Sequence, residues 1–216
     1  MSTPGKSPNT PTVLSRSDSC CTGAAAGVST VCLAPQLVQN TAPSFNSLPH
    51  CLQIIVFPLI YNYLVLKKLK VEIIKTSHDA PDPVGFVING GDKSIVYITD
   101  TGYINRKYYS KIKNKNLYII ESNYNDEMLM NGPYPYILKQ RVVGDSGHLS
   151  NDYTGKILKD AIGDKTKKII LAHISENNNT PEQALNDVYS HLKEVNFDKE
   201  NIITANQYEI TEMVVI

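Results

Sequence analysis

From residue 69 onward, short runs of β-branched and aromatic residues alternate with segments that carry strong helix-start signals. Five runs, each bounded by turn residues, predict strands: LKVEII (69–74), GFVIN (85–89), SIVYIT (94–99), LYIIE (117–121) and KIILA (168–172). One helix is predicted after Ser150-Asn151, and a second from Thr180-Pro181 to about Val195, where a capping threonine precedes a proline. Strands that alternate with helices predict an α/β layered fold.

Two finer predictions concern single elements. The first helix is expected to turn one apolar face inward, made of Tyr153, Ile157, Leu158 and Ala161. The final segment, IITANQYEITEMVV (202–215), is predicted to form a closing pair of strands.

The first 66 residues differ in composition from the rest of the chain. Their only charged residues are Lys6, Arg16 and Asp18, so 19 of the 21 basic and 20 of the 21 acidic residues follow. Residues 1–51 are rich in turn formers and have no apolar period, which predicts disorder. We therefore expect a boundary near residue 66, with residues 67–216 forming the folded domain.

Residues 52–66, LQIIVFPLIYNYLVL, form the most apolar run of the sequence. The run is shorter than the ~20 residues of a membrane-spanning helix, and Pro58 and Asn62 interrupt it. It also starts too far from the N-terminus for a secretory signal. A buried or aggregation-prone strand is favoured, while a membrane segment and a segment without a role stay open.

The overall charge balance argues against a non-specific electrostatic binder. The 21 basic and 21 acidic residues cancel, so no global field favours nucleic acid or membranes, although a local basic groove is compatible with this balance. All four cysteines lie before residue 52, and a cysteine-free main part fits a reducing, cytoplasmic location. We expect no stable membrane association, and the sequence leaves a homo-oligomer open.

Ionisable side chains stand where four of the predicted strands end. His78 follows the first strand, Asp100 the third, Glu121 closes the fourth and His173 follows the fifth. Strand ends of this kind meet at one edge of an α/β sheet, where such folds build their sites. Together with His148, these residues predict a divalent-metal site.

A competing interpretation comes from Gly144-Asp145-Ser146-Gly147, the four letters around the nucleophile of trypsin-like proteases. The context excludes it, because that fold is all-β and normally disulfide-linked, whereas this region has helix signals and no cysteine. The chemistry of the segment is therefore expected at His148.

Five segments resemble the C-terminal half of the metallo-β-lactamase-fold hydrolases, in the YycJ/WalJ-like branch related to RNase Z. They are SHDAPDPVGFVI, YITDTGYI, IIESNYNDEML, YPYILKQRVVGDSGHLSN and LAHISENNNTPEQAL, in this order between about residues 70 and 195. The resemblance implies a four-layer αββα sandwich with two zinc or manganese ions. It also implies cleavage of phosphodiester bonds in nucleic acid, from an end of the strand.

The resemblance assigns a role to each strand-end residue. His78 matches a ligand of the first metal, Asp100 the carboxylate shared by both metals, and His173 a ligand of the second metal. His148 matches the histidine that protonates the leaving oxygen, and Glu121 matches its carboxylate partner. Such a set suits hydrolysis, because paired metals polarise a phosphoryl oxygen and a positioned histidine acts as general acid.

The basic and aromatic segment RKYYSKIKNK (106–115) is a candidate surface for substrate. Arg106, Lys107 and Tyr108 are the residues expected to hold a phosphate backbone and stack a base. A solvated amphipathic helix without a binding role is the alternative.

Two departures from the family pattern shape the expectation for activity. The His-x-His-x-Asp-His motif is absent, since only His50 precedes His78, and Tyr124 stands where a histidine usually follows Glu-Ser-Asn. We hypothesise that residues 1–66 are foreign to the fold, through a truncated or chimeric reading frame. Two function classes therefore stay open, a metal-dependent nuclease and a non-catalytic remnant or interaction module, and the metal content distinguishes them.

Overall fold

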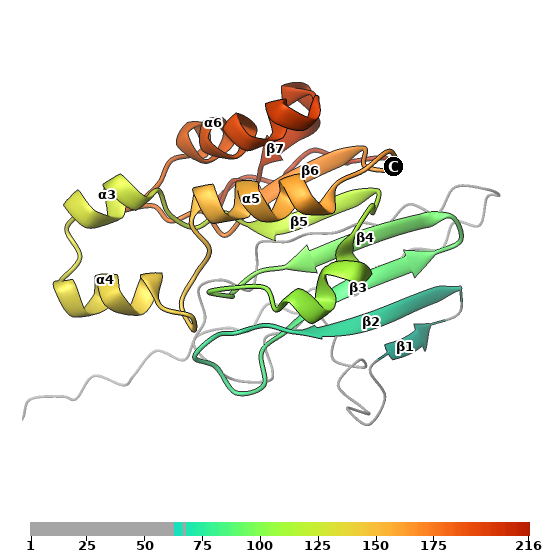
Figure 1. Cartoon of the computed structure of the whole chain (residues 1–216), viewed down its shortest axis with the longest axis horizontal. Helices are drawn as coiled ribbons and strands as arrows, with labels where there is room; N and C mark the ends of the chain where they lie inside the picture. Colours follow the sequence, from blue (N-terminus) through green and yellow to red (C-terminus); the bar gives the residue numbers. More distant parts are fainter. Residues whose placement is uncertain (1–62, 67) are drawn as a thin grey trace, which may run out of the picture. The chain divides into compact units, whose positions relative to one another are not determined.

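The computed structural model describes residues 63–66 and 68–216, which form a seven-stranded sheet whose strand order follows the chain order (Figure 1). The strands are β1 (Tyr63–Leu66), β2 (Leu69–Lys75), β3 (Val84–Gly90), β4 (Lys93–Ile98), β5 (Leu117–Glu121), β6 (Lys168–Ala172) and β7 (Ile202–Thr204). The five predicted strands are thus confirmed, with bounds that differ by one residue or less at either end. Strand β1 falls in the predicted apolar segment, of which residues 52–62 lie outside the described part.

The sheet changes direction at β4. Strands β1 to β4 pair antiparallel, and β4 to β7 pair parallel. The antiparallel half has short connections, while the parallel half needs longer crossovers that contain helices. These are η3 (Arg106–Tyr108), α2 (Tyr109–Ile112), α3 (Asp126–Asn131), α4 (Tyr136–Val143), α5 (Asn151–Ala161), α6 (Pro181–Leu192), η4 (Lys193–Val195) and η5 (Lys199–Asn201). The predicted α/β architecture is confirmed.

Helices α5 and α6 begin where the sequence signals place them. The Ser150 side chain accepts a hydrogen bond from the Tyr153 backbone N–H, and Thr180 caps α6 in the same way ahead of Pro181. The apolar face of α5 is confirmed for Ile157, Leu158 and Ala161, which are buried. Tyr153 is the exception, because its side chain stays 38% exposed.

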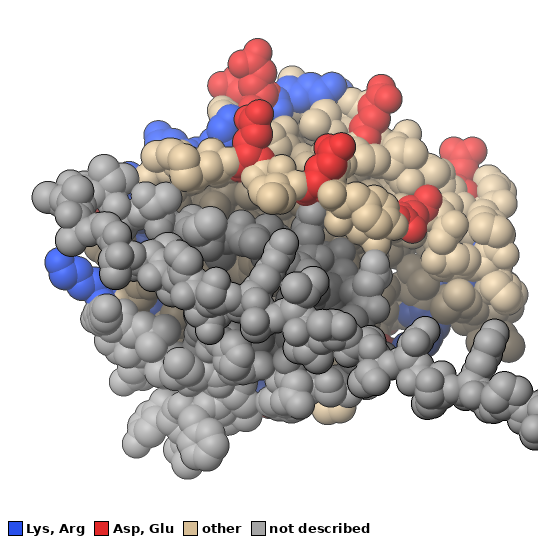
Figure 2. All heavy atoms as spheres, turned by 180° about the vertical axis from the view of Figure 1, so that it is seen from behind, with Lys and Arg blue, Asp and Glu red and all other residues tan. Residues whose placement is uncertain are grey.

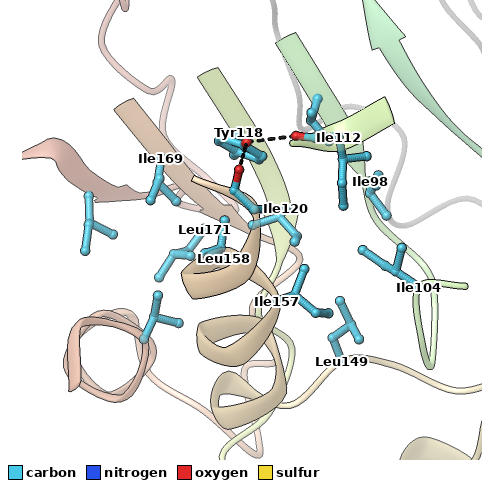
Figure 3. Close-up of a cluster of buried hydrophobic side chains, with 14 of the residues drawn as sticks. Ile98, Ile104, Ile112, Tyr118, Ile120, Leu149, Ile157, Leu158, Ile169 and Leu171 are labelled. Carbon is cyan, nitrogen blue, oxygen red and sulfur yellow. Dashed lines mark hydrogen bonds between the residues drawn. The ribbon is translucent and has the colours of Figure 1, made fainter. Parts of the chain in front are cut away.

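The main core lies between one face of the sheet and these two helices (Figure 3). Tyr118 and Ile120 of β5 and Ile169 and Leu171 of β6 point toward α5 and α6. The Tyr118 hydroxyl, deeply buried, donates to backbone carbonyl oxygens of Ile112 and Ala161 at 2.8 and 2.9 Å. Burial of this polar group is thereby compensated.

The opposite face of the sheet is apolar as well. Every residue of β5 is buried, as is usual for a strand that is covered on both faces. Leu117 and Ile119 of β5 join Ile170 of β6 in a second cluster. Val214 and Ile216 of the C-terminal segment pack against it.

The predicted closing strand pair is wrong. Only Ile202–Thr204 forms a strand, and the chain then leaves the sheet. In the segment after β7, the Asn206 side chain donates to the Glu209 side chain at 3.0 Å.

Acidic side chains on the face seen in Figure 2 stand apart from one another, with other residues between them. None of the described helices has the length and apolarity that crossing a membrane requires.

Candidate metal centre

The predicted site residues of the sheet meet at one edge. Glu121 is the last residue of β5, His173 directly follows β6, and Asp100 comes two residues after β4. Because these three strands are parallel neighbours, their carboxyl ends lie side by side. His173 Nε2 lies 3.5 Å from Asp100 Oδ1, and His78 Nε2, from the loop after β2, lies 3.9 Å from the same oxygen.

Two of these residues have an unusual backbone conformation. Asp100 and His173 have φ angles of 55° and 57°, in the left-handed region. This region costs a non-glycine residue free energy, and such residues gather at functional sites where the surrounding structure imposes them. Both residues stand at the point where a strand of the sheet ends.

Glu121 connects the two imidazoles of His148 and His173. Its Oε1 accepts hydrogen bonds from His148 Nδ1 at 2.7 Å and from His173 Nδ1 at 2.6 Å, while Oε2 accepts from the Thr101 backbone N–H at 3.0 Å. The side chain is fully buried. Burial alone would raise its pKa, but the hydrogen bonds from the two histidines outweigh burial and lower the pKa to about 2. Glu121 is therefore a carboxylate at neutral pH.

The hydrogen-bond partners fix which ring nitrogen of each histidine carries a proton. Both His148 and His173 face a carboxylate oxygen with Nδ1, and His78 Nδ1 faces the Gly147 carbonyl oxygen at 3.1 Å. Since these oxygens only accept, Nδ1 carries the proton in all three rings, and Nε2 is the nitrogen available to a metal. Carboxylates or carbonyls behind a histidine orient metal-ligating imidazoles in this way.

Three residues are close enough to hold one metal ion. One ligand atom each from Asp100, His148 and His173 lies within 4.8 Å of the others. Three protein ligands are the number found at catalytic zinc sites. For His173, burial would lower the pKa, but the hydrogen bond and charge of Glu121 outweigh it and raise the pKa. The donor set and the carboxylate behind it thus fit a divalent cation.

His148 is held by a tight turn between α4 and α5. Its backbone N–H donates to the Val142 carbonyl oxygen at 2.9 Å. A Cβ on the preceding residue, Gly147, would lie 2.1 Å from that same oxygen, so only glycine fits there. The imidazole lies between those of His78 and His173, with ring centroids 5.0 Å from each. Among the described residues, no hydrogen bond joins the Ser146 hydroxyl to a histidine, so the arrangement is not that of a serine protease.

A network of side-chain amides, from the buried Asn151 and Asn179 and the half-buried Asn123, was not predicted from the sequence and supports the site. Asn123 donates to the His173 carbonyl oxygen at 2.8 Å. Asn179 donates to the carbonyl oxygens of Ser122 and Asn123, both at 3.0 Å, and also contacts Asn151. The sequence did contain a signal for this network, because asparagines stand within a few residues of Glu121, His148 and His173.

A pocket of about 400 Å³ opens beside the cluster. His78, His148 and His173 belong to its lining, and so do Tyr134, Leu138 and Arg141. The predicted substrate residues Arg106, Lys107 and Tyr108 are not part of this lining. They form the short helix η3, where Lys107 Nζ lies 4.9 Å from the centre of the Tyr108 ring.

Comparison with known proteins finds one family model and several relatives that match part of this chain. A family model described as a β-lactamase superfamily domain matches residues 36–174. The chain is 38% identical over 129 residues to a protein named exodeoxyribonuclease YycJ from Bacillus anthracis, which covers 60% of this chain and 49% of the relative. It is 40% identical over 116 residues to exodeoxyribonuclease WalJ from Streptococcus pneumoniae, covering 54% and 43%. The chain thus spans about half the length of the curated relatives it matches.

Two solved structures match part of this chain. The metallo-β-lactamase fold protein YhfI from Bacillus subtilis has a TM-score of 0.46 and 19% identity, covering 59% of this chain and 45% of that one. The short form of human tRNase Z has a TM-score of 0.45 and 13% identity, covering 71% and 47%.

Proposed function

Because the chain belongs to the β-lactamase superfamily, we propose that the cluster at the ends of β4, β5 and β6 is the active site of a metal-dependent hydrolase that cleaves phosphodiester bonds in DNA. The observation that carries the proposal is the buried Glu121 carboxylate, which directs Nε2 of two imidazoles toward the site. The names of the two exodeoxyribonuclease relatives support the substrate.

His78, Asp100 and His173 are the residues that would hold the divalent metal, zinc or manganese. All three converge, since Asp100 Oδ1 lies within 4 Å of Nε2 of both histidines. When bound, a divalent metal supplies Lewis acidity toward the phosphodiester and lowers the pKa of water.

His148 is the residue we assign as general acid. Glu121 holds its Nδ1 proton, so a second proton on Nε2 can pass to the leaving oxygen while the carboxylate stabilises the charged ring. The grouping of His148 with Asp100 and His173 offers the alternative that Nε2 is itself a ligand. The two roles exclude each other at a given moment, because a ligating nitrogen carries no proton.

Metal content of purified variants tests the site. After mild dialysis, elemental analysis is expected to find bound divalent metal in the wild type and a clear loss in His173→Ala. His191→Ala is the matched control, because this histidine pairs with Asp152 on the helix layer and not with the site. Little or no metal in the wild type would reject the proposal and favour the non-catalytic remnant or interaction module.

His148→Ala separates the two roles of this histidine. A general acid predicts normal metal content with loss of cleavage of a DNA oligonucleotide, whereas a ligand predicts loss of metal. Activity that survives in this variant with its metals in place would contradict both assignments.

A further inference from the structure

The wall of the pocket formed by α4 and the segment before it has no role in the chemistry described so far. Three of its residues, Tyr134, Leu138 and Arg141, line the pocket together with the three histidines of the site. They offer an aromatic ring, an aliphatic side chain and a guanidinium group within one short stretch of chain. This combination matches the parts of a nucleotide, a flat base and an anionic phosphate.

The aromatic residue of this wall is held in place before any ligand binds. Tyr134 stands between Pro133 and Pro135, whose rings restrict the backbone on both sides. The ring packs against a small separate core of Tyr124, Leu129 and Val142. The Asn177 side chain, which also lines the pocket, donates to the Tyr134 hydroxyl at 3.5 Å. A ring fixed in this way loses little conformational freedom on stacking with a base.

The guanidinium group is anchored on one side only. Arg141 Nε donates to Asp79 Oδ2 at 2.5 Å, which orients the planar group next to His78. In the described part of the chain, no side-chain hydrogen bond engages its two terminal nitrogens, and the side chain is 65% exposed. Those nitrogens are the pair that binds a phosphate in the bidentate geometry that arginine favours.

From this wall we infer that the pocket is a binding subsite for the single nucleotide at the end of a DNA strand, with its base stacked on Tyr134 and its phosphate bound by Arg141. The inference rests on the proposed function and specifies which part of the substrate the site selects. A volume of about 400 Å³ lies near the lower end of the ~300–1,000 Å³ range of small-molecule pockets, so the pocket admits one nucleotide rather than a duplex.

Binding of small probes to the full chain tests the subsite without any cleavage. Calorimetry with deoxyadenosine monophosphate and with deoxyribose 5-phosphate separates the contribution of the base from that of the phosphate. The wild type is expected to bind the nucleotide about tenfold more tightly than the abasic sugar phosphate, as one stacked base implies. Equal affinity for the two probes would overturn the base-stacking role.

Two variants assign the residues. Tyr134→Ala is expected to weaken only the nucleotide, by about tenfold, and to abolish the preference for a base. Arg141→Ala is expected to weaken both probes alike by about tenfold, as loss of a charged hydrogen bond implies. Tyr136→Ala and Lys167→Ala are the matched controls, since Tyr136 is exposed at the start of α4, two residues after Tyr134, and Lys167 precedes β6, at its end away from His173. If controls and test variants behave alike, the assignment is wrong.

Asp79→Asn distinguishes phosphate binding from a purely structural role of the ion pair. In this variant no carboxylate charge offsets the guanidinium charge of Arg141. Both probes are therefore expected to bind as tightly as to the wild type or more tightly. Weakening equal to that of Arg141→Ala would mean that the pair only holds the loop, and would overturn the inference.

Metal content and DNA cleavage of the same samples separate this inference from the proposed function. A chain that holds metals and cleaves DNA but binds both probes equally contradicts the subsite alone. A chain that holds no metal yet shows the predicted pattern with the probes supports the subsite and contradicts the hydrolase.

Discussion

At the scale of single residues, the arrangement of the site depends on Glu121. One buried carboxylate accepts from two imidazoles and from the Thr101 backbone N–H, so three segments of chain share one acceptor. The strand-end positions of Asp100, Glu121 and His173 could be predicted, because a polar residue after an apolar run marks a strand end. That one oxygen of Glu121 serves both histidines could not, because it depends on the spacing of β5, β6 and the turn before α5.

Glu121→Gln is expected to lower the metal affinity about 10- to 100-fold, the usual cost of losing a carboxylate behind a metal-ligating histidine. The amide offers one acceptor oxygen without charge, and its NH₂ group opposes a ring N–H. Competition with a chromophoric chelator measures the change, with the solvent-exposed Glu182→Gln on α6 as control. An unchanged affinity would show that the imidazoles keep their orientation without this charge.

The low pKa of Glu121 predicts that the metal-free protein loses stability at acid pH. Its folded pKa of about 2 lies below the ordinary value of 4.5, so its contribution is complete above pH 4.5 and is lost as the pH falls toward 2. The difference corresponds to about 3 kcal/mol. Urea unfolding between pH 7 and pH 2.5, with chelator present, measures the free energies of unfolding of the wild type and Glu121→Gln. The difference between the two is expected to shrink as the pH approaches 2.5. A difference in the free energy of unfolding that does not depend on pH would contradict an ionised Glu121 carboxylate in the folded protein.

At the scale of elements, the packing of α5 against α6 depends on a glycine. A Cβ on Gly155 would lie 2.4 Å from His191 Cδ2, and His191 is held by Asp152 at 2.8 Å. Gly155→Ala is expected to gain about 1 kcal/mol of helix propensity and to lose about 1–3 kcal/mol to overpacking. The net effect is a modest loss of stability, measured by urea unfolding.

The double variant Gly155→Ala with His191→Ala provides the control. Once the ring is gone, the nearest remaining atom of residue 191 is its Cβ, at 3.2 Å from the added methyl group, so the same Gly155→Ala change is expected to destabilise the protein less. If Gly155→Ala destabilises the wild type and the His191→Ala variant equally, the added methyl group does not clash with the His191 ring.

Variants of the short helix η3 test the predicted basic surface. Arg106→Ala with Lys107→Ala is expected to weaken binding of single-stranded DNA and to make its salt dependence shallower, by a slope of about 0.7 for each phosphate that the protein no longer neutralises. Fluorescence anisotropy over a salt series measures both. An unchanged slope would favour the alternative of a solvated helix that does not touch the substrate.

The sequence predicted the long, periodic elements and missed the short ones. α5 and α6 carry caps and an apolar face, and the five predicted strands are apolar runs between turns. Helix α4 has exposed apolar residues, with Ile137 83% exposed, so no period marks it. Helix α3 has six residues, and its capping residue Asn125 was a signal in the sequence that did not lead to a prediction.

At the scale of the whole molecule, the boundary near residue 66 stays a prediction. If residues 1–51 are foreign to the fold, a chain of residues 52–216 keeps its thermal unfolding midpoint and its metal content. The family match begins at residue 36, so a chain of residues 36–216 is the control. Stability retained by the longer chain and lost by the shorter one would contradict the boundary.

The change of direction at β4 also has a consequence for the order in which the molecule assembles. The antiparallel strands up to β4 pair between residues near in sequence, whereas β5 to β7 must close long crossovers first. Local pairing forms faster than distant pairing. His78 and Asp100 belong to the first group, while Glu121, His148 and His173 belong to the second. The site therefore joins an early part of the fold to a late one, and a chain that has folded only its hairpins cannot yet capture a metal ion.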